Sequence, residues 1–199
     1  MTYIGIGTFF LGSSVAMLIK PGYSFKSQWL SDLGTGDYAA LFNFTLILTA
    51  IFTSSFYPIT FYLLRQNGYS TIKSITGVFL GVTSFIFLTL IGLFNLENDL
   101  HNLHVISSIG FIVSTSFAQL LLLSGFGWYT SVHLISSPAM DTRLSYTSLV
   151  VAIVFGFVFV EGIPFQQQIL QKLTIYLLIF TILYQSTCVW QSDELLSSD

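Results

Sequence analysis

Residues 72–96 read IKSITGVFLGVTSFIFLTLIGLFNL, and this apolar stretch decides the fold class. Hydrophobic side chains occur on every side of it, as in Val78-Phe79-Leu80, and polar and apolar positions do not alternate. A membrane-spanning strand needs about 10 residues of alternating polarity, whereas a helix that crosses ~30 Å of hydrocarbon needs about 20 apolar residues. A helix also satisfies its own backbone hydrogen bonds in lipid. The stretch is therefore predicted to be a transmembrane helix.

The composition of the whole chain indicates the same surroundings. Only 8% of the 199 residues are charged, against about 25% in water-soluble proteins, while 53% are hydrophobic and 17% are aromatic. So few charges cannot cover a water-exposed surface without leaving large apolar patches. The net charge of −3 offers no basic surface to nucleic acid. These values exclude a soluble monomer, a disordered chain and a nucleic-acid-binding protein, and they make the lipid bilayer the expected partner.

Six apolar stretches of this kind follow one another along the chain. We therefore predict an all-α, polytopic membrane protein: one domain over residues 1–199, folded as a compact bundle of six transmembrane helices. The predicted helices cover residues 2–19, 38–64, 72–96, 103–126, 146–163 and 169–190. Pro21 with Gly22 ends the first helix, and Pro58 is expected to kink the second.

An even number of crossings places both termini on one side of the membrane. The first, third and fifth connections then share the opposite side. Lys and Arg residues are divided equally between the two sides, so the positive-inside rule does not orient the bundle by count alone. Arg65 and Lys73 flank the tightest loop on the side of the termini, which favours a cytoplasmic position for both termini.

The ionisable side chains gather on the face made by the first, third and fifth connections. Such groups are costly near a membrane and therefore carry information about function. If these connections meet over one end of the bundle, the residues that converge there are Asp32, Glu97, Asp99, His101, His104 and Glu161. The candidate catalytic residues among them are Asp32, His101, His104 and Glu161.

The sharpest motif is the pair His101 and His104, because residues three apart lie on one face of a helix. Two imidazoles with a carboxylate from Asp99 or Asp32 suit Zn²⁺, which can activate water to hydrolyse a lipid ester or amide. In the structural alternative, Asp99 or Asn98 caps the helix and the histidines pack at the membrane interface. The pair lacks the glutamate of a His-Glu-x-x-His zinc box, which favours the structural alternative.

Asp32 and Glu161 have structural alternatives of their own. Asp32 either contributes to the site, with Ser31 as a hydrogen-bond donor to a lipid head group, or belongs to a short turn that ends near Gly34. Glu161 either reaches the membrane interface or points inward at a partner such as Lys172 or a histidine. The sequence favours the short turn for Asp32 and the membrane interface for Glu161.

A few positions inside the crossings are predicted to serve helix packing. Asn43 and Gln119 lie within apolar stretches, where an amide usually forms a hydrogen bond to a neighbouring helix. Gly77 and Gly81 are four residues apart, a spacing that lets two helices approach closely.

Several short stretches carry a resemblance to a known family: Pro21-Gly22-Tyr23, Ser31-Asp32-Leu33-Gly34, Leu41-Phe42-Asn43, Ile91-Gly92-Leu93-Phe94, and His101 with His104. In these stretches the chain resembles a prokaryotic six-helix membrane family defined as domain of unknown function number nine-nine-eight. It is more distantly similar to a eukaryotic six-helix group that contains autophagy modulators and lipid-anchor remodelling factors. The first resemblance implies the fold and the topology, and it assigns no catalytic residue.

The scarcity of polar groups inside the crossings favours a non-catalytic function. The leading hypothesis is a structural or regulatory bundle that packs against lipid, against partner membrane subunits or against a second copy of itself, without a cofactor. One alternative is a metal-dependent hydrolase with zinc, acting on lipid head groups at the face of the odd-numbered connections. The other is a small-solute transporter or channel, for which Asn43 and Gln119 would be the polar residues inside the crossings.

Overall fold

The computed structural model describes residues 1–66, 70–94, 102–133, 150 and 167–196. In this part of the chain all regular elements are helices, and five segments are long and apolar enough to cross a membrane. The prediction of an all-α, multi-pass membrane protein is thus confirmed. The fifth predicted helix, residues 146–163, lies outside the described residues apart from Val150.

The elements are α1 (Thr2–Ile19), the short 3-10 helix η1 (Leu30–Gly34), α2 (Ala39–Thr53), α3 (Phe56–Gln66), α4 (Thr71–Leu93), α5 (Leu103–His133) and α7 (Gln167–Leu196). α2 and the first residues of α3 form one apolar span that breaks between Thr53 and Phe56. Pro58 explains the break, because a proline cannot donate a backbone hydrogen bond to the carbonyl of Ser54 four residues earlier. The predicted kink in the second crossing is confirmed.

Three helices, α4, α5 and α7, have ends that differ from the prediction. α5 continues to His133 where residue 126 was the predicted end, and α7 runs from Gln167 to Leu196 where 169–190 was predicted. A fall in hydrophobicity marks the edge of the membrane, but it does not end a helix, and neither extension contains a proline. α4 instead ends early, at Leu93. α5 and α7 are each about 45 Å long and therefore exceed the ~30 Å hydrocarbon layer.

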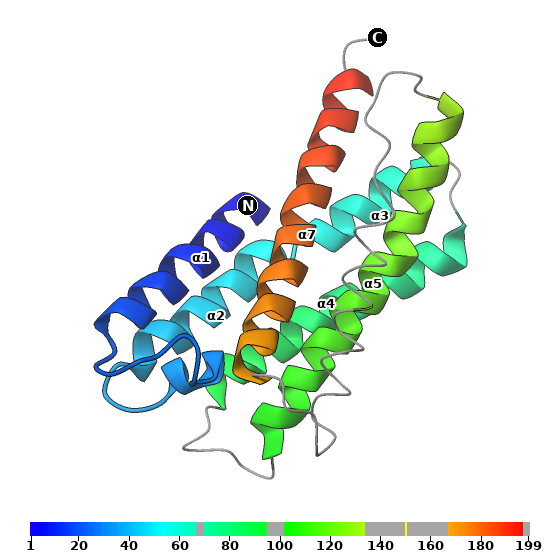
Figure 1. The fold of residues 1–199 in the computed structure, drawn as a ribbon. Helices are drawn as coiled ribbons and strands as arrows, with labels where there is room; N and C mark the ends of the chain where they lie inside the picture. The colour runs from blue at the N-terminus through cyan, green and yellow to red at the C-terminus, as the bar shows by residue number, and fades with distance from the viewer. Residues whose placement is uncertain (67–69, 95–101, 134–149, 151–166, 197–199) are drawn as a thin grey trace.

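α5 and α7 run in the same direction, from the bottom to the top of Figure 1. His104 at the start of α5 and Gln171 at the start of α7 line one cavity. The backbone N–H of Leu30, in the first connection, donates to Gln171 Oε1 at 2.8 Å. At the other end of the bundle, Tyr3 Oη donates to Thr187 Oγ1 at 3.4 Å. The N-terminus therefore lies beside the late part of α7, away from the first connection.

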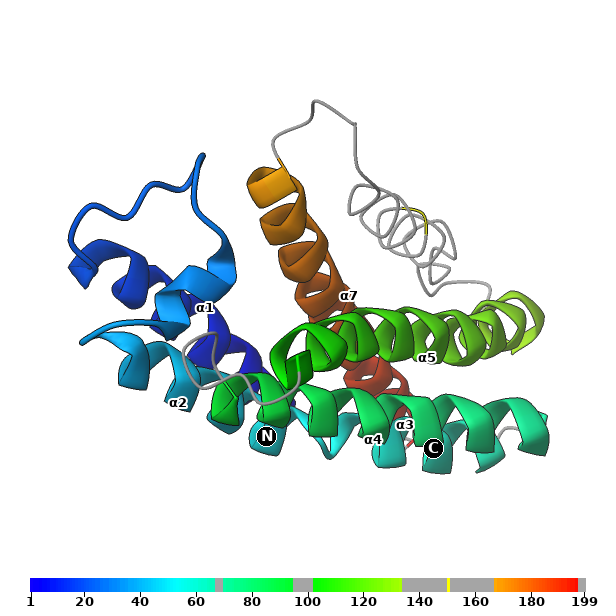
Figure 2. The same cartoon turned by 90° about the horizontal axis from the view of Figure 1, so that it is seen from below.

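Glycines let the helices approach closely. Gly81 of α4 faces the ring of Tyr57 from α3, and a Cβ added to Gly81 would lie closer than 3.0 Å to ring carbons. Gly77 packs against α5 in the same way, so the close approach predicted from this pair is confirmed. Gly12 of α1 lies equally close to Thr45 of α2. Figure 2 shows the result for α4 and α5, which lie along each other over much of their length.

Polar side chains inside the crossings are bonded mainly within their own helix. Thr49 Oγ1, for example, donates to the Thr45 carbonyl at 2.8 Å. Gln119 is an exception, because its Nε2 donates to the Leu178 carbonyl of α7 at 3.1 Å, which confirms the predicted bond to a neighbouring helix. Asn43 Nδ2 donates at 3.4 Å to a backbone carbonyl of η1, so it binds the first connection and not another crossing.

Candidate functional site

The first connection, residues 20–38, folds over one end of the bundle, and we call this end the loop end. Its centre is η1, where the Trp29 N–H donates to Asp32 Oδ2 at 2.7 Å and the Asp32 N–H donates back to the Trp29 carbonyl at 3.2 Å. Lys20 Nζ donates to the carbonyl of Thr35 at 2.9 Å and to the carbonyl of Asp32. The Asp32 carboxylate thus takes part in the short turn that the structural alternative describes.

Lys172 connects the first connection to α7. Its side chain is fully buried, and Nζ donates to the carbonyls of Phe25 at 2.7 Å, Gln168 at 3.4 Å and Gln28. Nζ also lies 4.8 Å from the centre of the Phe25 ring, a cation–π contact. Three carbonyl acceptors match the three N–H donors of an ammonium group, so the buried charge is solvated by backbone. Glu161, a predicted partner of Lys172, lies outside the described residues.

Tyr23 adds a further bond within the first connection. Its Oη donates to the Trp29 carbonyl at 3.3 Å. Burial raises the pKa of the Tyr23 phenol well above its usual range, and Tyr176 and Asp32 nearby raise this pKa further. The phenol therefore keeps its proton at physiological pH and remains a hydrogen-bond donor to the loop.

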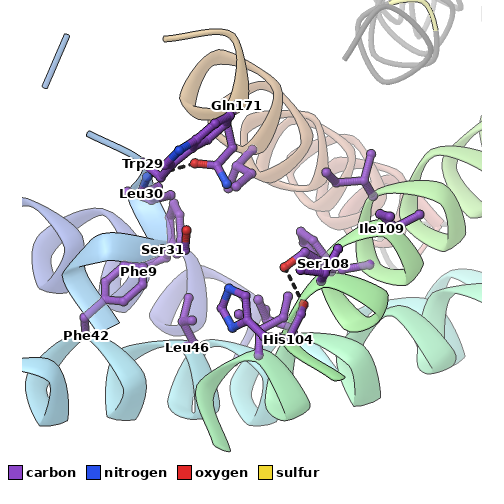
Figure 3. Close-up of a pocket in the computed structure, with 16 residues that line it drawn as sticks. Phe9, Trp29, Leu30, Ser31, Phe42, Leu46, His104, Ser108, Ile109 and Gln171 are labelled. Carbon is purple, nitrogen blue, oxygen red and sulfur yellow. Dashed lines mark hydrogen bonds between the residues drawn. The ribbon is translucent and has the colours of Figure 1, made fainter. Parts of the chain in front are cut away.

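A cavity of about 320 Å³ lies beneath the first connection, between η1 and helices α1, α2, α4, α5 and α7 (Figure 3). Of the sixteen described residues that line it, twelve are apolar. The polar ones are Ser31, His104, Ser108 and Gln171. The volume and the apolar lining with a few polar groups are typical of small-molecule binding sites in proteins.

The polar and apolar lining residues lie at different depths. Along α5, His104 and Ser108 come before Ile112, and along α7, Gln171 comes before Ile175. Because a helix rises 1.5 Å per residue, Ile112 is about 12 Å deeper in the bundle than His104. The cavity therefore has a polar end next to the first connection and an apolar end inside the membrane-spanning part.

His104 holds the start of α5 against the end of α4. It is buried, and its Nδ1 lies 2.8 Å from the carbonyl of Phe94, the C-cap of α4. Because a carbonyl oxygen only accepts hydrogen bonds, Nδ1 carries the proton. The bond satisfies a carbonyl at a helix C-terminus, and the same kind of bond orients histidines that bind metals.

The structure describes two of the predicted site residues, Asp32 and His104. His104 lines the cavity, whereas the Asp32 carboxylate is bonded within η1. The predicted site residues outside the described part of the chain are Glu97, Asp99, His101 and Glu161. Among the residues that are described, no three His, Cys, Asp or Glu side chains are grouped to hold a metal ion. The zinc site formed by His101, His104, Asp99 and Asp32 stays a prediction.

Two polar residues of the cavity, Ser108 and Gln171, are not evident as site residues in the sequence. Neither is ionisable, so the cost of burying charge does not point to them. The available signal is spacing: Ser108 follows His104 by four residues, and Ile175 follows Gln171 by four, so each pair shares a helix face. That both faces border one cavity becomes visible only in the folded chain (Figure 3).

The comparisons with known proteins identify a family. A family profile, described as Protein of unknown function (DUF998), matches residues 3–184. No curated protein and no solved structure matches the chain. The profile match begins in α1 and ends in α7, so it extends over the whole bundle and includes every described residue that lines the cavity. The chain therefore belongs to the DUF998 family.

Proposed function

We propose that this protein is a non-catalytic integral membrane protein of structural or regulatory type, and that its working site is the loop-end cavity, which takes a hydrophobic chain from the bilayer. The observation that carries the proposal is the cavity itself: about 320 Å³ between helices long enough to cross a membrane, with twelve apolar residues in its lining. A lipid chain fills such a space without leaving polar groups of its own unpaired.

The edge of the cavity supports access for such a chain. Val105 and Ile109 of α5 line the cavity, yet 43% and 51% of their surface is exposed. The outer surface of the bundle is also apolar, with large exposed side chains such as Phe44, Ile51 and Phe79. An apolar outer surface that continues into an apolar cavity suits the exchange of a hydrophobic chain with surrounding lipid.

A bundle of six crossings, with residues 146–163 as the fifth along the chain, completes the proposal. α5 and α7 run in the same direction and each is about 45 Å long, so the chain must return from the end of α5 to the start of α7. Residues 146–163 are the apolar stretch available for that return. Six crossings also agree with Tyr3 and Thr187 lying at one end. We propose that both termini are cytoplasmic, and that tags fused to either terminus react with a cytoplasmic modification reagent.

The described polar groups support a non-catalytic function. The Asp32 carboxylate accepts from the Trp29 N–H, and His104 Nδ1 donates to the Phe94 carbonyl, so both candidate residues have structural tasks. The second candidate function is a zinc-dependent hydrolase, which is favoured by the Nδ1 bond of His104 because ligating histidines make that bond. Zinc bound in near-equal amount to purified protein would support the hydrolase. Absence of zinc, with no effect of a chelator on lipid binding, would support the non-catalytic function.

A pair of substitutions on one face of α5 tests the cavity. Ile109→Trp places an indole at the cavity edge, while Val113→Trp places one at a similarly exposed position, four residues later, outside the lining. We expect purified protein to bind a fluorescent single-chain lipid, with Ile109→Trp weakening binding about tenfold, equivalent to about 1.4 kcal/mol, and Val113→Trp leaving it unchanged. Equal binding by both variants and the unsubstituted protein would show that the cavity is not the binding site.

A further inference from the structure

We infer that the loop-end cavity selects an uncharged amphiphile: a single-chain lipid whose head group is a hydroxyl, ester or amide. The inference rests on the proposed function, because it names the chemical class of the ligand that the cavity takes. It is carried by three features of the cavity, namely the absence of charge from its described lining, the donors and acceptors at its polar end, and the depth order of its walls.

The described lining offers no counter-charge to an ionised head group. None of the sixteen lining residues is Asp, Glu, Lys or Arg. Three charged groups described at the loop end are bonded elsewhere: Lys172 Nζ to three carbonyls, Lys20 Nζ to the carbonyls of Asp32 and Thr35, and the Asp32 carboxylate to the Trp29 N–H. A carboxylate or ammonium head group would lose its water without gaining an ion-pair partner among the described lining residues, which is strongly unfavourable.

The polar end of the cavity offers hydrogen bonds that suit a neutral head group. The Ser31 hydroxyl both donates and accepts, and among the described residues no hydrogen bond uses its Oγ. Gln171 uses Oε1 to accept from the Leu30 N–H, so it presents the N–H donors of its amide. Figure 3 shows Ser31 and Gln171 on one side of the cavity, with His104 and Ser108 across from them. A hydroxyl or carbonyl placed between these walls finds both donors and acceptors.

The order of polar and apolar lining residues from the loop end inward sets the orientation of the ligand in the cavity. Ser31, His104 and Gln171 lie next to the first connection, whereas Phe9 and Ile112 line the part of the cavity within the membrane-spanning helices. Ile112 lies about 12 Å from His104 along α5, with Ser108 between them, and the lining of α5 beyond Ser108 is apolar. A single chain therefore points into the bundle, with its head group at the level of the membrane interface.

Competition among three lipids with the same palmitoyl-length chain tests the inference. Purified protein in detergent binds a fluorescent monoacylglycerol, which is then displaced by unlabelled monopalmitoylglycerol, palmitate or palmitylamine. We expect the neutral lipid to compete at least about tenfold better than the anionic and the cationic one. Equal competition by all three, with Ile109→Trp still weakening binding, would overturn the inference and leave the proposed function standing. No binding of any of the three would overturn the proposed function itself.

A charge introduced into the lining sharpens the test. Gln171→Glu keeps an oxygen that accepts from the Leu30 N–H but replaces the amide donor with a negative charge at the polar end of the cavity. We expect this variant to lose affinity for monopalmitoylglycerol and to gain affinity for palmitylamine. Gln167→Glu adds the same charge one helical turn earlier, outside the described lining, and should keep the original preference. An unchanged order of preference in Gln171→Glu would overturn the assignment of the head-group position.

Discussion

The loop end and the membrane-spanning interior use polar side chains in opposite ways. At the loop end, Gln171 and Lys172 bond to backbone groups 141 and 147 residues earlier in the chain. In the interior, hydroxyls such as that of Thr49 bond to the carbonyl four residues earlier, and the helices meet through glycines such as Gly81. Long-range polar bonds therefore shape the end that holds the cavity, whereas close packing of apolar surfaces holds the helices together.

Removing the Lys172 side chain should have the largest effect. Lys172→Ala breaks three charge-assisted hydrogen bonds and leaves the Phe25 and Gln28 carbonyls of the first connection without this donor. We expect a loss of about 3 kcal/mol in the free energy of unfolding, measured by thermal unfolding in detergent, together with faster proteolysis of residues 20–38. Lys73→Ala, at an exposed position in the first turn of α4, is the control and should change neither measurement. Equal stability of the two variants would mean that Lys172 does not hold the loop end.

A methyl group added at Gly81, in the membrane-spanning interior, should have the next largest effect on stability. A Cβ at this position would meet the ring of Tyr57, which is fully buried and cannot move away freely. We expect Gly81→Ala to destabilise the protein by about 2 kcal/mol through overpacking. Gly7→Ala is the matched control, because a Cβ at Gly7 meets no atom within 4 Å. If both alanine variants melt at the same temperature, close packing at Gly81 does not stabilise the interior.

Truncation of Gln171 should give a smaller effect at the loop end. Gln171→Ala leaves the backbone N–H of Leu30 without its side-chain acceptor, and we expect a cost of about 1 kcal/mol in thermal unfolding. Gln171→Glu retains an acceptor oxygen and should recover most of that stability. If Gln171→Glu is as unstable as Gln171→Ala, the bond to Leu30 is not what stabilises this contact.

Replacing an interior hydroxyl should have the smallest effect. Thr49→Val keeps the shape of the side chain and removes only the bond to the Thr45 carbonyl, which already accepts within the same helix. We expect a change below about 0.5 kcal/mol in the free energy of unfolding. A loss comparable to that of Gln171→Ala would show that interior hydroxyls do contribute to tertiary stability, which contradicts the contrast between the two regions.

The positions of the helices can be predicted from the sequence, because a helix of about 20 consecutive apolar residues matches the thickness of the hydrocarbon layer. The ends of α5 and α7 do not follow, because helices continue into water when no residue stops them. Within the site, His104 is predictable as an ionisable residue near the membrane. Gln171 is not, because its partner Leu30 is distant in sequence and the pairing exists only after folding. For the same reason Lys172 resembles an ordinary charge at the end of a membrane helix until the structure shows it buried.

The bond from Lys172 to the carbonyl of Phe25 has a consequence for the order of events during biosynthesis. The donor is 147 residues downstream of its acceptor, and a ribosome adds about 5–20 residues per second, so roughly 7–30 s separate their appearance. During that interval the first connection has emerged but its anchor has not been translated. α7 is thus the helix that closes the first loop, and a nascent chain released before that helix would carry an unfinished cavity into the membrane.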